Sequence, residues 1–143
     1  MIVRPAEPRD ADAVLALMEG LTRPAVAADP GPQRDVFLAH LEHPDAQVFV
    51  AEVDGEVAGA VSLWFQPRLN WTTAQAWIPD LYVDPAFRRR GAARALLDAC
   101  VDDARAQGCH RLVLESGHHR AKAHRLYEHY GFQHYARAYA LEL

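Results

Sequence analysis

The chain has 143 residues, of which half are hydrophobic and 24% are charged, a composition that predicts one globular domain over residues 1–143. Its formal net charge of −4 argues against nucleic acid as a partner. We expect a cytoplasmic protein without a membrane partner, because the N-terminal MIVRPAEPRD lacks a signal-peptide core and no apolar run reaches the roughly 20 residues of a membrane span.

The chain is predicted to begin with a short strand and two helices. Residues Ile2 to Arg4 form the strand, and Asp10 is a plausible N-cap for a helix whose apolar residues recur between Ala13 and Leu21. A loop rich in proline and glycine leads to a second helix, roughly Gln33 to His43, which Pro44 ends.

Three strands then follow, and we expect them to form an antiparallel meander. Asp54-Gly55 is a strong hairpin-turn signal between the strands Gln47–Val53 and Glu56–Phe65. A further loop leads to the strand Gln75–Val83, which the dipeptide Asp84-Pro85 ends.

The remaining elements predict a crossover and a closing helix. A helix with one apolar face runs from Gly91 to about Gln107, the strand Arg111–Glu115 follows, and a helix covers about Ala121 to Tyr130. The tail Phe132–Leu143 is interpreted as one or two final strands. This order indicates a single α+β domain whose strand–helix–strand crossover is right-handed and parallel.

One segment is predicted to form a strand, then an arginine-rich loop, and then the start of a helix. Its sequence is IPDLYVDPAFRRRGAARALL. The first backbone N–H groups of a helix have no partner within it, lie at the positive end of its dipole, and can bind phosphate where small residues allow close approach. Amides from Arg89 to Ala93 are therefore predicted to hold a phosphate pair, with the arginine heads adding charge. The alternative is a solvated run of charge at residues 88–90.

Two motifs in this part of the chain resemble those of the GCN5-related N-acetyltransferase (GNAT) superfamily. The run Arg88-x-x-Gly91-x-Ala93 matches the family signature R/Q-x-x-G-x-G/A, and AHRLYEHYGF resembles its hallmark A-x-x-x-Y-E-x-x-G-F. Both lie at the family's spacing on the expected elements, and the resemblance covers about Ile78 to Phe132.

The resemblance implies a mostly antiparallel sheet with a splayed parallel strand pair, here Gln75–Val83 and Arg111–Ser116, flanked by about four helices. It also implies acetyl-CoA as the co-substrate. The pantetheine arm would pair with the first of these strands, and a backbone N–H near Val83 would polarise the thioester carbonyl. The cofactor-binding residues implied are Leu81, Tyr82, Val83, Arg88, Arg89, Arg90, Gly91, Ala92 and Ala93.

The match to AHRLYEHYGF makes Tyr127 the candidate general acid, because a phenol pKa near ~10 lies close enough to a thiol pKa near ~8.5 for proton donation to a CoA thiolate. The alternatives are a core aromatic role and the neighbouring Tyr130. Asp80, just before the segment expected to bind the cofactor, is the candidate general base, directly or through water. Glu115 is the second candidate for that role.

Arg120 replaces the asparagine that many relatives carry at this position, and it would contact either the cofactor or the acceptor. The SGHHRAKAHRLYEHYGF region and the upstream hairpin resemble aminoalkylphosphonate N-acetyltransferases, for which Arg120 would be a phosphonate partner. His118 and His119 belong to the same loop, but no metal-ligand spacing occurs, so no metal is expected. Candidate acceptor-binding segments are Leu21–Pro32 and Trp64–Trp71.

The function expected from the resemblance is direct transfer of an acetyl group from acetyl-CoA to the primary amine of a small molecule in a ternary complex. Alternatives are acetylation of protein N-termini or lysines, acetylation of charged tRNA, and a non-catalytic acyl-CoA-binding module. Relatives are often dimers, so a homodimer is possible. The sequence leaves the acceptor amine and the oligomeric state open.

Overall fold

The computed structural model describes residues 1–21 and 29–143, which fall into two compact units, 1–113 and 114–143. The first unit holds the sheet and three α-helices, and the second holds the fourth α-helix and the C-terminal tail. No helix in the described ranges is long and apolar enough to cross a bilayer.

The sheet in the first unit is mostly antiparallel, in the order β1-β2-β3-β4-β6, with β5 pairing separately with β3. Its strands are β1 (Ile2–Pro5), β2 (Ala46–Val53), β3 (Glu56–Gln66), β4 (Gln75–Ile78), β5 (Leu81–Val83) and β6 (Leu112–Leu114). At the β4–β6 junction, Ala76 donates to the Arg111 carbonyl and His110 to the Ala74 carbonyl, so the bonds advance in the same direction along both segments and the strands are parallel.

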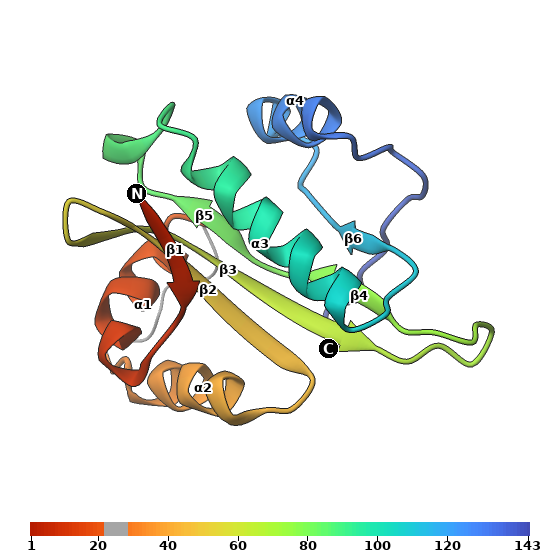
Figure 1. The fold of residues 1–143 in the computed structure, drawn as a ribbon, viewed down its shortest axis with the longest axis horizontal. Helices are drawn as coiled ribbons and strands as arrows, with labels where there is room; N and C mark the ends of the chain where they lie inside the picture. The colour runs from red at the N-terminus through yellow and green to blue at the C-terminus, as the bar shows by residue number, and fades with distance from the viewer. Residues whose placement is uncertain (22–28) are drawn as a thin grey trace. The chain divides into compact units, whose positions relative to one another are not determined.

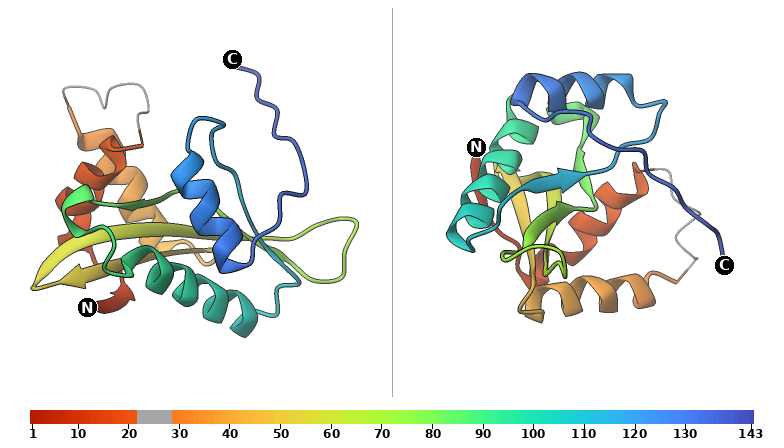
Figure 2. Two further views of the ribbon diagram at one scale, coloured as in Figure 1. Left: turned by 90° about the horizontal axis from the view of Figure 1, so that it is seen from above. Right: turned by 90° about the vertical axis from the view of Figure 1, so that its right-hand side faces the viewer.

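Helices cover both faces of this sheet. Figures 1 and 2 show α3 (Ala92–Ala106) on one face and α1 (Ala11–Glu19) with α2 (Gly31–Glu42) on the other. Because both faces are covered, β3 is buried continuously from Ala58 to Leu63. The α+β class, the four α-helices and the parallel strand pair confirm the predicted fold.

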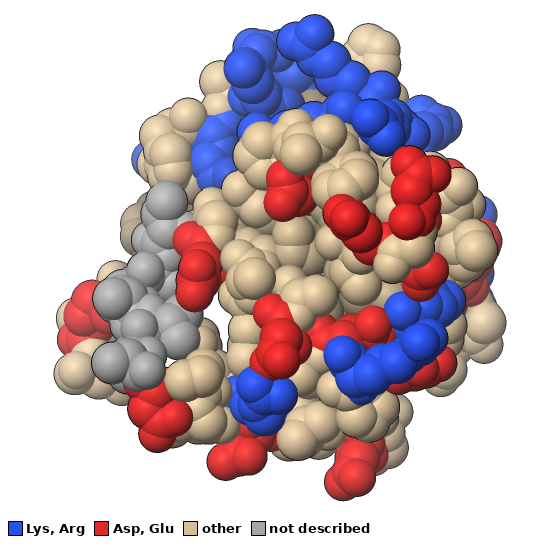
Figure 3. All heavy atoms as spheres, turned by 90° about the vertical axis from the view of Figure 1, so that its left-hand side faces the viewer, with Lys and Arg blue, Asp and Glu red and all other residues tan. Residues whose placement is uncertain are grey.

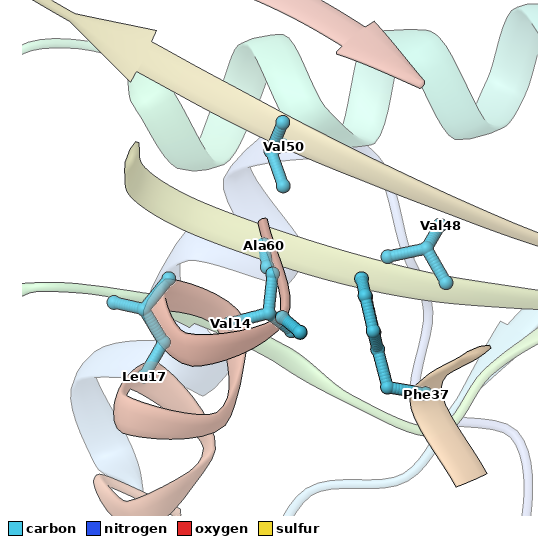
Figure 4. Packing of buried hydrophobic residues seen from close by; sticks show 7 residues of the cluster. Val14, Leu17, Phe37, Val48, Val50 and Ala60 are labelled. Carbon is cyan, nitrogen blue, oxygen red and sulfur yellow. The ribbon is translucent and has the colours of Figure 1, made fainter. Parts of the chain in front are cut away.

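A hydrophobic cluster joins α1 and α2 to the sheet (Figure 4). Phe37 of α2 and Val14 of α1 pack against Val48, Val50 and Ala60, and all five side chains are buried. The alternation of side chains along β3 puts Ala60 and Ser62 on the face that α1 and α2 cover.

Two predictions about strands are wrong. The expected strand Gln75–Val83 is divided into β4 and β5. Trp64 of β3 pairs with Trp77, and Val61 of β3 pairs with Leu81. The two β3 residues between these pairs therefore lie opposite three residues, 78–80. The extra residue is a β-bulge, and Pro79 within it has no amide to donate to the ladder.

The tail expected to form final strands is irregular throughout 132–143, a range that the structure describes completely. A strand is stable only when its backbone pairs with another strand. In the second unit the regular structure is α4 (Ala121–Tyr130) and the last residue of β6, so the tail has no strand partner there.

The beginning of α1 is fixed by an ion pair that is largely removed from water. Asp10, only 5% exposed, accepts bonds from both terminal nitrogens of Arg4, at 2.8 and 2.9 Å, and from the Glu7 amide at 2.7 Å. The bonds to the Arg4 guanidinium, above all, lower the pKa of the Asp10 carboxyl. Arg4 also donates to Glu52, so the pair ties α1 to β1 and β2.

We therefore predict that Asp10→Asn lowers the free energy of unfolding at neutral pH by about 3 kcal/mol. Because the folded-state pKa of Asp10 is depressed, its contribution is complete above the unfolded value of 3.8 and is lost as the pH falls through the folded value. Urea unfolding of both proteins should thus show a difference that is constant near neutral pH and shrinks below about pH 4.

Asp12→Asn is the matched control, since the Asp12 side chain is 81% exposed and pairs with Arg34 at the surface. Its effect should stay within about 1 kcal/mol. An equal loss of stability in both variants, or a difference that does not depend on pH, would contradict the assignment.

Candidate active site

The loop between β5 and α3 presents backbone amides at the start of a 15-residue helix. Gly91, the N-cap of α3, has φ +81° and Arg89 has φ +62°, so two left-handed residues flank Arg90. The first hydrogen bond of the helix is donated by the Ala95 amide to the Gly91 carbonyl. The amides before Ala95 have no acceptor within the helix and lie at the positive end of its dipole, which is the arrangement that binds phosphate.

The three arginines of the loop are exposed, and two of them fold back over aromatic rings. The Arg88 guanidinium lies 5.6 Å from the centre of the Tyr82 ring and donates to the Val83 carbonyl, while Arg90 lies 5.7 Å from the Phe87 ring. Figure 3 shows both basic (blue) and acidic (red) side chains on the face that it draws. The loop thus presents backbone amides at the helix start, with exposed arginines beside them.

The strand β5 lies close to β3, which is its one strand partner among the described residues. A Cβ at Gly59 of β3 would lie 3.0 Å from the Tyr82 carbonyl and from Val83, so this approach requires glycine. Leu81 and Val83 are buried, and the Tyr82 ring packs beside Gly20 at the end of α1. Since these side chains are engaged within the protein, the part of β5 left for a ligand is its backbone edge.

Asp80 lies in the bulge between β4 and β5. Its backbone carbonyl accepts from the Ser62 amide at 2.9 Å, and its Oδ2 accepts from the Ser62 hydroxyl at 3.1 Å. These bonds orient the carboxylate on the face of the sheet that α1 and α2 cover. Sequence reasoning did not identify Ser62, because only the register of β3 shows that it lies opposite the bulge.

A cavity of about 460 Å³ opens beside this carboxylate, within the first unit. Residues of α1, α2, β2 and β3 line it, together with Asp80. This volume falls in the ordinary range of small-molecule sites, roughly 300–1,000 Å³. The helix residues of this lining were also missed by sequence reasoning, because their helical spacing is that of ordinary core residues.

Tyr127 lies in α4 of the second unit and is 8% exposed. Its ring meets that of Phe132 edge to face, with 5.9 Å between the ring centres. Burial raises the pKa of the Tyr127 phenol, and the positive charge of Arg120 opposes that rise only in part. The phenol is therefore protonated at neutral pH, as a general acid must be.

Other residues singled out from the sequence also lie in the second unit. Arg120 is the N-cap of α4, Glu115 is exposed, and the His119 ring folds back over Gly117. His118 is exposed as well. Within residues 1–21 and 29–143, no group of three or more His, Cys, Asp or Glu side chains is placed to hold a metal ion.

The two predicted acceptor segments differ in their relation to the cavity. Most of Leu21–Pro32 falls on residues 22–28, outside the described residues, although Leu21 does line the cavity. Trp64 packs against the rings of His40 and His43, and Trp71 stacks on His110 with 4.6 Å between the ring centres. Neither tryptophan is among the residues that line the cavity.

Comparison with known proteins gives the family. The sequence model of the acetyltransferase (GNAT) family matches residues 14–132. The chain is 32% identical to "Uncharacterized N-acetyltransferase YhfO" of Bacillus subtilis, over 93% of this chain and 90% of that protein. It is 31% identical to the aminoalkylphosphonate N-acetyltransferase of Salmonella typhimurium, over 92% and 84% of the two chains.

Its fold resembles that of "Putative acetyltransferase from Agrobacterium tumefaciens", with a TM-score of 0.88, 25% identity and complete coverage of both chains. The matched range includes the β5–α3 loop, Asp80 and Tyr127. The chain belongs to the GNAT family and is an acyl-CoA-dependent acetyltransferase.

Proposed function

We propose that this acetyltransferase transfers the acetyl group of acetyl-CoA directly to the primary amine of a small molecule. The observation that carries the proposal is the arrangement around β5. At one end of this strand lies a helix N-terminus with free amides, and at the other lies a carboxylate that opens onto a cavity. The strand itself offers an unpaired edge between them.

The amides from Arg89 to Ala93 would hold the pyrophosphate of acetyl-CoA, with Arg88, Arg89 and Arg90 adding charge around it. The backbone edge of Leu81, Tyr82 and Val83 would pair with the pantetheine arm. Arg120 would add a contact to the cofactor or to the acceptor. Left-handed Gly91 supports the first assignment, because its missing side chain leaves open space at the helix start.

In the reaction, the amine nitrogen attacks the thioester carbonyl carbon, so that a C–N bond forms and the C–S bond breaks. Asp80 would accept the proton that the amine loses, directly or through water, and Ser62 would hold the carboxylate in place. Tyr127 would donate a proton to the departing thiolate. This assignment makes a thioester-cleavage assay with an amine panel the primary test.

The panel should contain monoamines, polyamines, aminosugars, aminophosphonates and peptides with free N-termini or lysines. We expect turnover with a class of small amines. Turnover with peptides alone would favour the protein-directed alternative, and tight CoA binding without any turnover would mean a non-catalytic module. Size-exclusion chromatography of the same preparation would test whether the protein forms a homodimer.

Tyr127→Phe should lower kcat by about 100-fold or more, while the affinity for acetyl-CoA stays nearly unchanged. The reason is that the substitution removes the proton donor but keeps the buried ring. Tyr130→Phe, on the same helix, is the matched control and should leave kcat within about twofold of the wild-type value. An unaffected kcat in Tyr127→Phe would assign thiolate protonation to another group.

Gly91→Glu should abolish acetyl-CoA binding, measured by calorimetry, because a carboxylate beside the phosphate-binding amides repels the pyrophosphate. Gly55→Glu is the control, since Gly55 has φ +80° against +81° for Gly91 and an added Cβ meets no atom within 4 Å at either position. Both variants therefore carry the same backbone strain and the same charge. Equal loss of binding in both would show that the effect is not local to the loop.

The protonated state of Tyr127 can be checked by ultraviolet titration of tyrosinate. Because burial raises the pKa of Tyr127, the difference between wild type and Tyr127→Phe should titrate above the ordinary value of 10.0. A difference signal that titrates at or below that value would contradict the burial of this phenol.

A further inference from the structure

We infer that the acceptor of this enzyme is a monoamine with an apolar, aromatic or branched alkyl body, bound in the cavity under α1 and α2. This inference rests on the proposed function and names the chemical class of its substrate. It is carried by the composition of the cavity lining and by the position of Asp80 at its edge.

The body of the cavity is apolar. Leu15 and Met18 of α1 face it from one side, Val36 and Phe37 of α2 from another, and Val48 of β2 from the sheet. A ligand group that leaves water for such a lining gains roughly 1.5–3 kcal/mol when it is the size of a leucine or phenylalanine side chain. Apolar groups of this size therefore distinguish good acceptors from poor ones.

The charged lining residues are acidic. Asp80 and Glu19 carry the carboxylates, and Gln33, His40 and Ser62 are the remaining polar residues. Among the described lining residues there is no Lys or Arg, and neither carboxylate forms an ion pair with a described residue. One cationic amine head next to Asp80 is the charge that this arrangement stabilises.

Asp80 also places that amine next to the reaction. It directly precedes Leu81, the first residue of β5, and its Oδ2 is held by Ser62. Since β5 is the strand proposed to bind the pantetheine arm, an amine held by Asp80 would lie beside the thioester with its apolar body in the cavity. The same carboxylate would thus select the amine and accept its proton.

Anionic acceptors fit this cavity poorly. Against the described lining, a phosphonate or phosphate group would meet apolar side chains and two carboxylates but no Lys or Arg, so its desolvation cost would not be repaid by these residues. An aminosugar would bring hydroxyls that the few polar residues of the described lining do not satisfy. A polyamine such as spermidine would bring three charged nitrogens into an apolar cavity whose described lining carries two carboxylates.

The test compares phenethylamine with aminoethylphosphonate, glucosamine and spermidine as acceptors for the full chain. We expect kcat/KM for phenethylamine to exceed that for each of the others by about 10-fold to 100-fold. A higher value for the phosphonate, the aminosugar or the polyamine would overturn the inference but would leave the proposed function intact.

Val36→Lys provides the structural arm of the test. Val36 lies on α2 and is 56% exposed, so lysine is compatible with the fold while its charge enters the cavity mouth. We expect at least a tenfold weaker affinity for phenethylamine and a smaller preference over aminoethylphosphonate. Ala39→Lys, an exposed position on the same helix outside the cavity lining, is the control and should change neither.

Phenethylamine binding is also measured by calorimetry without acetyl-CoA, so that the result does not depend on turnover. Binding that Val36→Lys weakens and Ala39→Lys does not would support the cavity as the acceptor site even if no product formed. Binding that neither variant changes, or no detectable binding, would overturn the inference. Absence of turnover with every amine would instead contradict the proposed function.

Discussion

The bulge between β4 and β5 is the constraint on which the rest of the candidate site depends. One extra residue within 78–80 shifts the register against β3. As a result, β5 does not continue the strand order from β4 to β6 but pairs separately with β3. That departure gives β5 a backbone edge without a partner. It also places the Asp80 carboxylate against Ser62 at the border of the cavity.

The same constraint connects the two halves of the proposed chemistry. The chain leaves β5 through a short 3-10 turn, Pro85–Phe87, and enters α3 at left-handed Gly91. A single run from Asp80 to Ala93 therefore contains the carboxylate, the free strand edge and the helix N-terminus. No long-range rearrangement is needed to bring these groups together, because they lie within one continuous segment.

In the proposed function, acceptor specificity would depend on different elements from cofactor binding. The cavity wall is built by α1 and α2, and α1 is tied to β1 and β2 through the Arg4–Asp10 pair and the bond from Arg4 to Glu52. The β5–α3 loop takes no part in that wall. The first helices can thus set the acceptor class while the loop keeps its phosphate-binding geometry, which is a physical route to many substrates on one fold.

The sequence by itself determined the fold class, the GNAT family, the boundaries of most elements within two residues, and the loop Arg88 to Ala93 as a candidate site. These features are local. Helical periodicity, the Asp54-Gly55 turn and the strand–loop–helix order can each be recognised from a short stretch of sequence. Asp80 and Tyr127 were proposed in the same way, from their motifs, and their catalytic roles stay predictions.

Only the tertiary structure decided the division of the Gln75–Val83 segment, the partnership of Ser62 with Asp80, and the cavity under α1 and α2. Each of these depends on register or packing between segments that are distant in the chain. Leu15 and Val36 carry the periodicity of core residues, and nothing local distinguishes a side chain that lines a cavity from one that fills a core. The tail 132–143 shows the same limit, because the strands predicted there needed a pairing partner that the local sequence does not reveal, and the segment is irregular.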